Sequence, residues 1–329
     1  MSVHQYHQTP SGHPLLLNVV GSGSPVLITI HGGGIVNGSR IDPHAPESIT
    51  SAWPGTWIAA DYRLLVPSTA FDIKDDIEAL FRYILTLPVD PHQIFLAGFS
   101  GGAYPLRLAL VHAAEEALRN NPRFSVRGWV SYFGMGGDVL LDYWLSPRDN
   151  ERQAPLQLDA EELKRERAMW KGKLQHWYDD GKEYSSVPYT PGLENHTPER
   201  DDIWTAFHRT GTFNDVLTGH PRLSAQLASL PKAERQRQLP THLLPLYPQV
   251  YLAEHPSRIP PGLLIHGDAD PAVPYEESVR TWEDLKSNGR TELVTVRGGD
   301  HGLRVNGEVS EEGERADRYA LEWMLGLCK

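Results

Sequence analysis

The chain has 329 residues, of which 40% are hydrophobic and 22% charged, a balance typical of a globular protein with a sizeable core. Its formal net charge of −11 at pH 7 argues against nucleic acid as a main partner, because binding to phosphates requires a basic face. Cys328 is the only cysteine, which excludes a disulfide within the chain.

The N-terminal residues and the hydropathy pattern bear on where the protein works. No run approaches the roughly 18 apolar residues of a membrane span, so no span is expected. The first residues, MSVHQYHQTPSGHP, lack a basic start followed by an apolar stretch, and no secretory signal is predicted. Together with the single cysteine, these features predict a cytoplasmic protein.

Strand-like and helix-like segments alternate along the first 134 residues. A hairpin is predicted within residues 1–20, and apolar runs at 25–30 and 56–64 are typical of strands buried on both faces. Residues 72–88 place apolar side chains at helical spacing and end at a proline, so a helix is predicted there. A strand, a helix and a further strand are predicted at 93–102, 103–120 and 124–134. This βαβ spacing predicts a mainly parallel central sheet with helices on both faces.

The alternation breaks between residues 135 and 260. This stretch is rich in proline, charge and aromatic residues and has no buried-strand runs; its charged piece at 159–181 is most simply a solvated helix. A strand, a helix, a strand and a helix are then predicted at 261–270, 275–289, 291–299 and 314–327. We therefore expect residues 1–134 and 261–329 to form one α/β core, with 135–260 as a cap or lid inserted after the sixth strand.

A Gly-x-Ser-x-Gly motif, GFSGG, occupies residues 98–102 between a predicted strand and a predicted helix. A serine on a tight strand-to-helix turn projects its hydroxyl above the sheet edge, and the flanking glycines relieve crowding there. The start of the following helix adds partial positive charge where an oxyanion would form. The motif in this context makes Ser100 the candidate nucleophile.

A serine hydroxyl needs a general base at neutral pH, and His301 is the candidate. It lies in GGDHGL, between the last predicted strand and the last predicted helix, a placement that the other histidines lack. A carboxylate must orient the imidazole, and both Asp268 and Asp270 follow the preceding strand. Asp270 is favoured because it lies further into its loop and can reach His301, whereas Asp268 would hold the turn together.

Three consecutive glycines follow an early predicted strand in HGGG, residues 31–34. Their bare backbone suits a loop whose N–H groups face a developing negative charge. Gly33 and Gly34, joined by Gly101 after the serine, are the candidate oxyanion donors. His31 ends the strand beside these glycines and is expected to brace the loop by hydrogen bonds rather than to transfer protons.

These motifs resemble those of the α/β-hydrolase superfamily, in particular the hormone-sensitive-lipase-like esterases and the related kynurenine-formamidase-like enzymes. The chain order Ser, Asp, His is the order of that fold. The resemblance implies an α/β-hydrolase fold with Ser100, Asp270 and His301 as the catalytic triad and the same three glycines as oxyanion donors. The matching pieces are HGGG (31–34), DYRL (61–64), GFSGG (98–102), GDADPAVP (267–274) and GGDHGL (298–303).

The sequence departs from the family pattern beside these motifs. Ile35 follows the three glycines where the family commonly has an aromatic residue, and Phe99 precedes the serine where an aspartate is frequent. Both are candidate substrate-contacting residues, with Trp204 and Phe213 from the predicted lid. Most of the lid's aromatic residues are expected to fill a small core of its own, and a minority to line an apolar pocket.

The expected function is a serine hydrolase that cleaves a carboxylic ester of a small, largely apolar or aromatic molecule, with a thioester or an amide left open. This chemistry requires no cofactor and no metal. One alternative is an acyltransferase, lyase or cyclase of a biosynthetic pathway on the same scaffold, because a large lid can exclude water. The other is a ligand-binding protein derived from a hydrolase.

Overall fold

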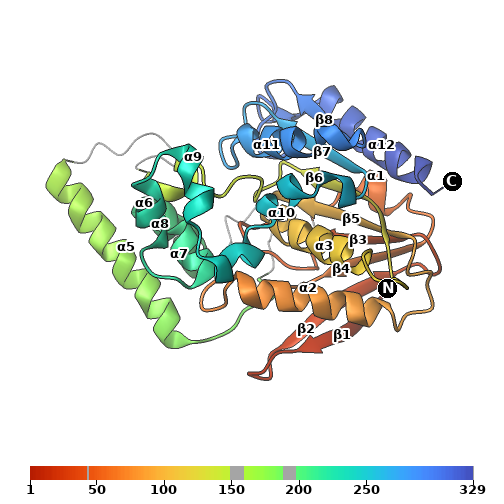
Figure 1. The fold of residues 1–329 in the computed structure, drawn as a ribbon, viewed down its shortest axis with the longest axis horizontal. Coiled ribbons are helices and arrows are strands. Elements are labelled where there is room, and N and C mark those ends of the chain that lie inside the picture. Colours follow the sequence, from red (N-terminus) through yellow and green to blue (C-terminus); the bar gives the residue numbers. More distant parts are fainter. Residues whose placement is uncertain (43, 149–158, 188–197, 329) are drawn as a thin grey trace.

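The computed structural model describes residues 1–42, 44–148, 159–187 and 198–328 (Figure 1). Within these residues, eight strands form one sheet in the order β1-β2-β4-β3-β5-β6-β7-β8. The pairs β1–β2 and β2–β4 are antiparallel, and the other neighbouring pairs are parallel. The strands are β1 (Ser2–Gln8), β2 (Pro14–Val20), β3 (Val26–Ile30), β4 (Thr56–Ala60), β5 (Ile94–Phe99), β6 (Val126–Tyr132), β7 (Gly262–Gly267) and β8 (Thr291–Val296).

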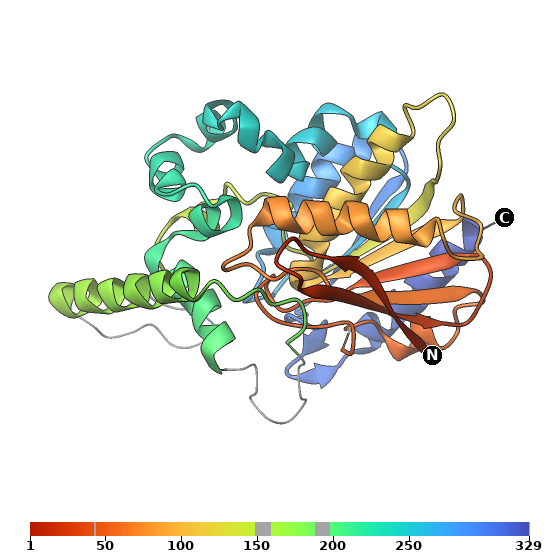
Figure 2. The ribbon, with the colours of Figure 1, turned by 90° about the horizontal axis from the view of Figure 1, so that it is seen from below.

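Helices cover both faces of this sheet (Figure 2). On one face lie α2 (Ala70–Ile84), α3 (Ala103–Glu116), α10 (Pro248–Glu254) and α11 (Tyr275–Leu285). On the other face lie α1 (Glu47–Thr50) and α12 (Glu311–Gly326). Every residue of β3, β5 and β7 is buried, which is why these strands read as unbroken apolar runs. The predicted mainly parallel sheet between two helical layers is confirmed.

Element boundaries differ from the predicted ones mainly at helix ends. The helix predicted over 72–88 is α2, which begins earlier because Thr69 and Asp72 form a capping box, and ends at Ile84. The helix predicted over 103–120 is α3 and ends at Glu116. A short hairpin of β9 (Arg304–Val305) and β10 (Glu308–Val309), absent from the sequence-based expectation, precedes α12.

Residues 135–260, here called the β6–β7 segment, leave the sheet after β6 and are helical wherever regular structure is assigned. Besides α10, the α-helices described in this segment are α4 (Asp142–Leu145), α5 (Ala160–Asp180), α6 (Pro198–Thr210), α7 (Phe213–Thr218), α8 (Leu223–Ala228) and α9 (Lys232–Arg235). Helix α5, predicted at 159–181, begins at a capping box of Asp159 and Glu162 and ends at Gly181 in the left-handed region. It stands furthest from the sheet and packs along α6 (Figure 1).

The β6–β7 segment shares its buried interior with the sheet and its helices. One continuous cluster of buried apolar side chains includes Ile35 and Tyr104 from the sheet side and Trp144 and Phe207 from the segment. Helix α10, near the segment's end, packs directly on α3 and α11. The division into a core and an inserted lid therefore stays a prediction. In the part of the chain that the structure describes, no helix is both long and apolar enough to cross a membrane.

Candidate active site

Ser100 occupies a tight turn between β5 and the short 3₁₀ helix that leads into α3. Its φ is 50°, in the left-handed region that non-glycine residues rarely adopt. The turn lies so close to β3 that a Cβ at Gly102 would stand 2.3 Å from the carbonyl oxygen of Ile30. The sharp turn and the adjacent glycine present the serine hydroxyl at the carboxyl edge of the sheet, as the motif predicts.

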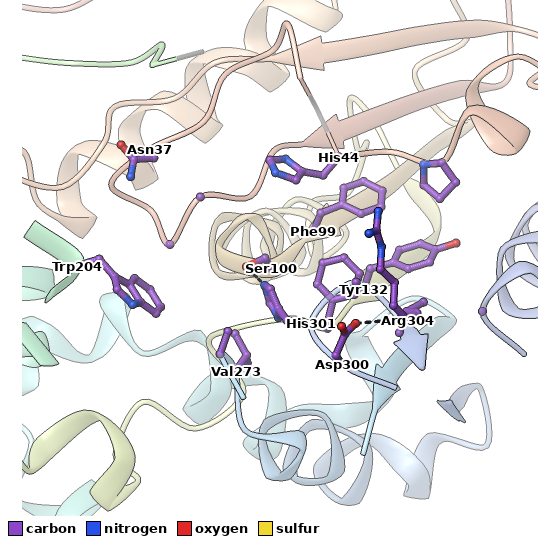
Figure 3. Close-up of a pocket in the computed structure, with 18 of the residues that line it drawn as sticks. Asn37, His44, Phe99, Ser100, Tyr132, Trp204, Val273, Asp300, His301 and Arg304 are labelled. Atoms are coloured by element: carbon purple, nitrogen blue, oxygen red, sulfur yellow. Dashed lines mark hydrogen bonds between the residues drawn. The ribbon is translucent and has the colours of Figure 1, made fainter. Parts of the chain in front are cut away.

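The imidazole of His301 joins Ser100 to Asp270. Its Nε2 lies 2.8 Å from Ser100 Oγ, and its Nδ1 lies 2.7 Å from Asp270 Oδ2. His301 comes from the loop after β8, and the edge of its ring meets Phe133, with ring centroids 4.9 Å apart. Figure 3 shows the serine and histidine side chains pointing toward one another. Three residues that are up to 201 positions apart in sequence thus form one continuous hydrogen-bonded chain.

Asp270 is held as a buried carboxylate at the end of β7. Its Oδ1 accepts hydrogen bonds from the backbone N–H groups of Ala272 (2.7 Å) and Val273 (3.0 Å). Burial alone would raise the pKa of Asp270, but hydrogen bonds from His266 and His301 outweigh it and hold the pKa well below its usual value. The carboxylate therefore stays charged beside His301 and can stabilise an imidazolium.

The competing acids take other positions. Asp268 is exposed, and its Oδ1 accepts the backbone N–H of Gly298 at 2.6 Å, which ties the loop after β7 to the loop after β8. Asp300 accepts the backbone N–H of Arg304 at 2.9 Å. Of Asp268, Asp270 and Asp300, Asp270 is therefore the acid whose carboxylate hydrogen-bonds to His301.

His266 is a residue that the sequence reasoning missed. It is fully buried on β7, with Nε2 3.1 Å from Asp270 Oδ2 and Nδ1 2.7 Å from Ser278 Oγ. A carboxylate can only accept, so Nε2 carries the proton and Nδ1 accepts from the Ser278 hydroxyl. The signal available in the sequence was a polar residue inside an apolar strand, four positions before the acid.

The glycine loop after β3 lies beside Ser100. Gly33 and Gly34 have φ of 94° and 62°, and both line the cavity described below. A Cβ at Gly101 would stand 2.7 Å from the backbone nitrogen of Gly34, so the two backbones are in close approach. Among the described residues, the N–H groups of Gly33 and Gly34 make no backbone hydrogen bond.

His31, at the start of the glycine loop, holds this loop by a hydrogen bond and by ring stacking. It is fully buried and stacks on Tyr62 with ring centroids 4.4 Å apart. Its Nδ1 donates to the carbonyl of Gly32 at 2.9 Å. Burial lowers the pKa of His31 to about 3, so the ring is neutral at ordinary pH. These contacts agree with a bracing role.

A cavity of about 910 Å³ opens over Ser100 and His301. In Figure 3, Trp204 lies on one side of the pair, and Phe99, Tyr132 and Arg304 lie on the other. Apolar lining side chains include Phe99, Tyr132, Phe133, Trp204, Val273 and Leu303. Polar side chains, among them Asn37, Arg209, Asp300 and Arg304, line the cavity as well, so it offers a ligand both apolar and polar contacts.

Two of the four predicted substrate-contacting residues, Phe99 and Trp204, line this cavity, and the structure corrects the other two. The side chain of Ile35 is fully buried and points into the core, because the loop turns at Gly34. Phe213 is also fully buried and packs between Trp144 and Phe207, with ring centroids 4.8 and 5.1 Å away. Within the described residues, no group of His, Cys, Asp and Glu side chains is arranged to hold a metal ion.

Comparisons with known proteins support the fold. Residues 199–326 match the prolyl oligopeptidase family, a stretch that contains Asp270 and His301 and begins after Ser100. An α/β-hydrolase superfamily protein from Enterococcus faecalis superposes with a TM-score of 0.63 at 16% identity, over 97% of this chain and 97% of that chain. An esterase from Pyrobaculum calidifontis gives a TM-score of 0.59 at 19% identity, over 99% and 85% of the respective chains. The chain has an α/β-hydrolase fold.

Curated relatives match this chain in part. It is 31% identical over 147 residues to a probable carboxylesterase M8 of Phoma sp., covering 37% of this chain and 43% of that protein. It is 22% identical over 342 residues to the non-reducing polyketide synthase ausA of Penicillium brasilianum, covering 88% of this chain and 12% of the synthase. The chain thus spans less than half the length of these relatives.

Proposed function

We propose that the protein is a serine hydrolase that cleaves carboxylic esters of small, largely apolar molecules through an acyl-enzyme. The observation that carries the proposal is the unbroken hydrogen-bonded chain of Ser100, His301 and Asp270 on the wall of a cavity lined by both apolar and polar side chains. The similarity to a probable carboxylesterase and to solved esterases supports the same reaction class.

In the proposed reaction, Ser100 Oγ attacks the ester carbonyl while His301 Nε2 takes the hydroxyl proton. The bond from Oγ to the carbonyl carbon forms, and the carbonyl oxygen becomes an oxyanion. When this intermediate collapses, the bond to the leaving alcohol breaks, and His301 returns the proton to it. Water, deprotonated by the same histidine, then attacks the acyl-enzyme; the bond from the acyl carbon to Ser100 Oγ breaks, His301 returns the proton to Oγ, and the carboxylic acid is released.

Asp270 and the glycine backbone have supporting parts in this scheme. The ionised carboxylate of Asp270 fixes the imidazole tautomer with the proton on Nδ1 and stabilises the imidazolium. The N–H groups of Gly33, Gly34 and Gly101 bind the oxyanion, and removal of one such donor typically costs about 10²–10³-fold in kcat. We further propose that residues 135–260 form the lid of the site, since Trp204 and Arg209 from this segment line the cavity.

The test is covalent labelling combined with turnover. A fluorophosphonate probe is expected to label the wild-type protein at Ser100, located by peptide mapping, and the protein is expected to hydrolyse chromogenic p-nitrophenyl esters. Ser100→Ala should abolish both while its circular dichroism spectrum stays unchanged. Labelling at another serine, or full turnover by the variant, would contradict the proposal.

Acyl transfer to an acceptor other than water is the second candidate. It is favoured by the match between nearly the whole chain and a part of non-reducing polyketide synthases. Product analysis in the presence of an added alcohol or amine distinguishes the two, because a transferase forms the new ester or amide in preference to the free acid. A role in ligand binding alone is disfavoured because the Ser100–His301–Asp270 chain is complete.

A further inference from the structure

Helix α6 of the β6–β7 segment carries a buried arginine, Arg200, that hydrogen-bonds to the glycine loop. Arg200 is 3% exposed, and its guanidinium donates to three backbone carbonyls. Nε bonds Val36 at 2.9 Å, and the two terminal nitrogens bond Leu65 at 2.6 Å and Val66 at 2.8 Å. All three carbonyls belong to the loops that follow β3 and β4, at the edge of the sheet where Ser100 lies.

Burying a charged guanidinium costs free energy, so a buried arginine is expected only where its hydrogen bonds serve the structure. Burial lowers the pKa of Arg200 to about 10, and in the described part of the chain the structure places no carboxylate against it. Instead it stacks on Tyr184, with its central carbon 4.6 Å from the ring centroid. An apolar side chain would fill the space at lower cost, so what Arg200 adds is a fixed set of donors for carbonyls that would otherwise be buried and unpaired.

The loop held in this way has an unfavourable backbone. Gly33, Gly34 and Ile35 all have positive φ, and at the β-branched Ile35 the value is 65°. A β-branched residue in this region is a genuine outlier, and such a conformation persists only where the surroundings fix it. The carbonyl of Val36, directly after Ile35, is the one that Arg200 holds.

Other contacts from the β6–β7 segment hold the same loop. The side-chain amide of Asn37 donates to Asp201 Oδ1 at 2.7 Å, and Gly38 and Val187 exchange two backbone hydrogen bonds of 3.1 and 2.9 Å. Of these contacts, the Arg200 hydrogen bond lies closest in sequence to the N–H groups that would meet an oxyanion. The guanidinium also reaches both loops at once, which the other contacts do not.

We infer that Arg200 is a positioning residue: it fixes the conformation of residues 33–36 in which the N–H groups of Gly33 and Gly34 face the oxyanion. This inference rests on the proposed hydrolase function. Because the oxyanion exists only in the transition state and the tetrahedral intermediate, loss of Arg200 should lower kcat and leave substrate binding nearly unchanged.

The test compares Arg200 with a matched arginine of the same segment. Arg235 is 4% exposed and donates to the carbonyls of Leu140, Leu227 and Leu230, all within the segment. Among the described residues it also has a carboxylate partner in the segment, which Arg200 lacks: it donates to Asp142 at 2.5 Å. With a p-nitrophenyl ester, Arg200→Ala should lower kcat by about 10–100-fold and change KM by less than about threefold. Arg235→Ala should leave kcat within about threefold of the wild-type value, even if its melting temperature falls by as much as that of Arg200→Ala.

A second readout separates positioning from general destabilisation. The affinity for an alkyl trifluoromethyl ketone, which binds as a tetrahedral oxyanion, should fall in parallel with kcat/KM in Arg200→Ala. The affinity for the planar carboxylic acid product should not fall with it. Arg200→Lys keeps the charge but loses the planar fork of donors, so it should recover part of the rate. If Arg200→Ala does not fold, Arg200→Lys is expected to show the same kcat-selective loss, about tenfold.

The failures of the two proposals are distinguishable. If the wild type turns over esters through Ser100 but Arg200→Ala and Arg235→Ala lose equal activity, Arg200 is structural and the inference is wrong. The inference is equally wrong if Arg200→Ala retains wild-type kcat, or if KM rises instead of kcat falling. If Ser100 of the wild type is neither labelled nor needed for turnover, the hydrolase proposal is itself overturned, and this inference with it.

Discussion

The indole of Trp204 lies directly on the backbone of Gly34. A Cβ at position 34 would stand 2.3 Å from Cε3 of the indole, closer than real contacts allow, and the φ of 62° would strain any other residue. The collision involves the ring that also lines the cavity. The third glycine of HGGG is therefore required by a side chain 170 positions later, as well as by the backbone conformation.

Gly34→Ala should displace the loop and lower kcat by about 10²–10³-fold, the cost typical of one lost oxyanion donor. If the collision is the cause, Trp204→Ala in the same chain should recover part of the loss, measured as a non-additive double-mutant cycle. Gly23→Ala is the control, since Gly23 also has positive φ but nothing lies within 4 Å of its added Cβ. Strict additivity of the Gly34 and Trp204 substitutions would contradict this explanation.

Trp204 and Phe213 should differ in what their removal changes. Trp204→Ala enlarges the cavity, so kcat/KM should shift unequally across p-nitrophenyl esters of increasing acyl length. Phe213→Ala removes a buried ring away from the cavity and should lower the free energy of unfolding by about 3–5 kcal/mol, with the order of preferred substrates unchanged. A uniform loss over all esters for Trp204→Ala would remove its assigned part in specificity.

Asp270→Asn should cost about 10⁴-fold in kcat, because the amide no longer selects the imidazole tautomer that activates Ser100. Asp268→Asn loses the charge on an exposed group that binds the Gly298 N–H, so it should lower the melting temperature slightly and leave kcat nearly unchanged. Steady-state kinetics and thermal unfolding of both variants check this. Reversed phenotypes would exchange the two assignments.

Asp61 gives a prediction for the pH dependence of stability. Burial raises the pKa of Asp61 to about 6, against hydrogen bonds from Arg40 that lower it. Its folded pKa is thus above the unfolded value of about 4, so its contribution is fully present below pH 4 and is lost as pH rises to about 6. Relative to Asp61→Asn, the wild type should lose at most about 3 kcal/mol of unfolding free energy over that interval. Urea titrations at several pH values measure the difference, and a pH-independent difference would refute the shift.

The sheet and the positions of the reactive side chains were predictable because their sequence patterns are distinctive. Strands buried on both faces are continuous apolar runs, and parallel strands bring their carboxyl ends to one edge. Ser100 and Asp270 follow such runs and His301 follows the less buried strand β8, so their meeting follows from the strand order. The same reasoning could not distinguish Trp204 from Phe213, because which face of a short helix meets the cavity depends on how the helices pack.

Arg200 and His266 show where the sequence carries too little information. Arg200 stands in TPERDDIW, a stretch that looks solvent-exposed, and its partners are backbone carbonyls that every residue has. His266 is recognisable only once β7 is known to place it against Asp270. Predicting either requires the path of a long connection in space, which local patterns do not determine.

The hydrogen bonds and contacts between the glycine loop and the β6–β7 segment limit how this scaffold can be recombined. Val187, Arg200 and Trp204 all contact residues 34–38, which belong to the first eighth of the chain. A β6–β7 segment taken from a relative would place that relative's residues, instead of Trp204, Arg200 and Val187, against this glycine loop. Functional chimaeras should therefore require both stretches to come from the same parent, and directed-evolution libraries should vary them jointly.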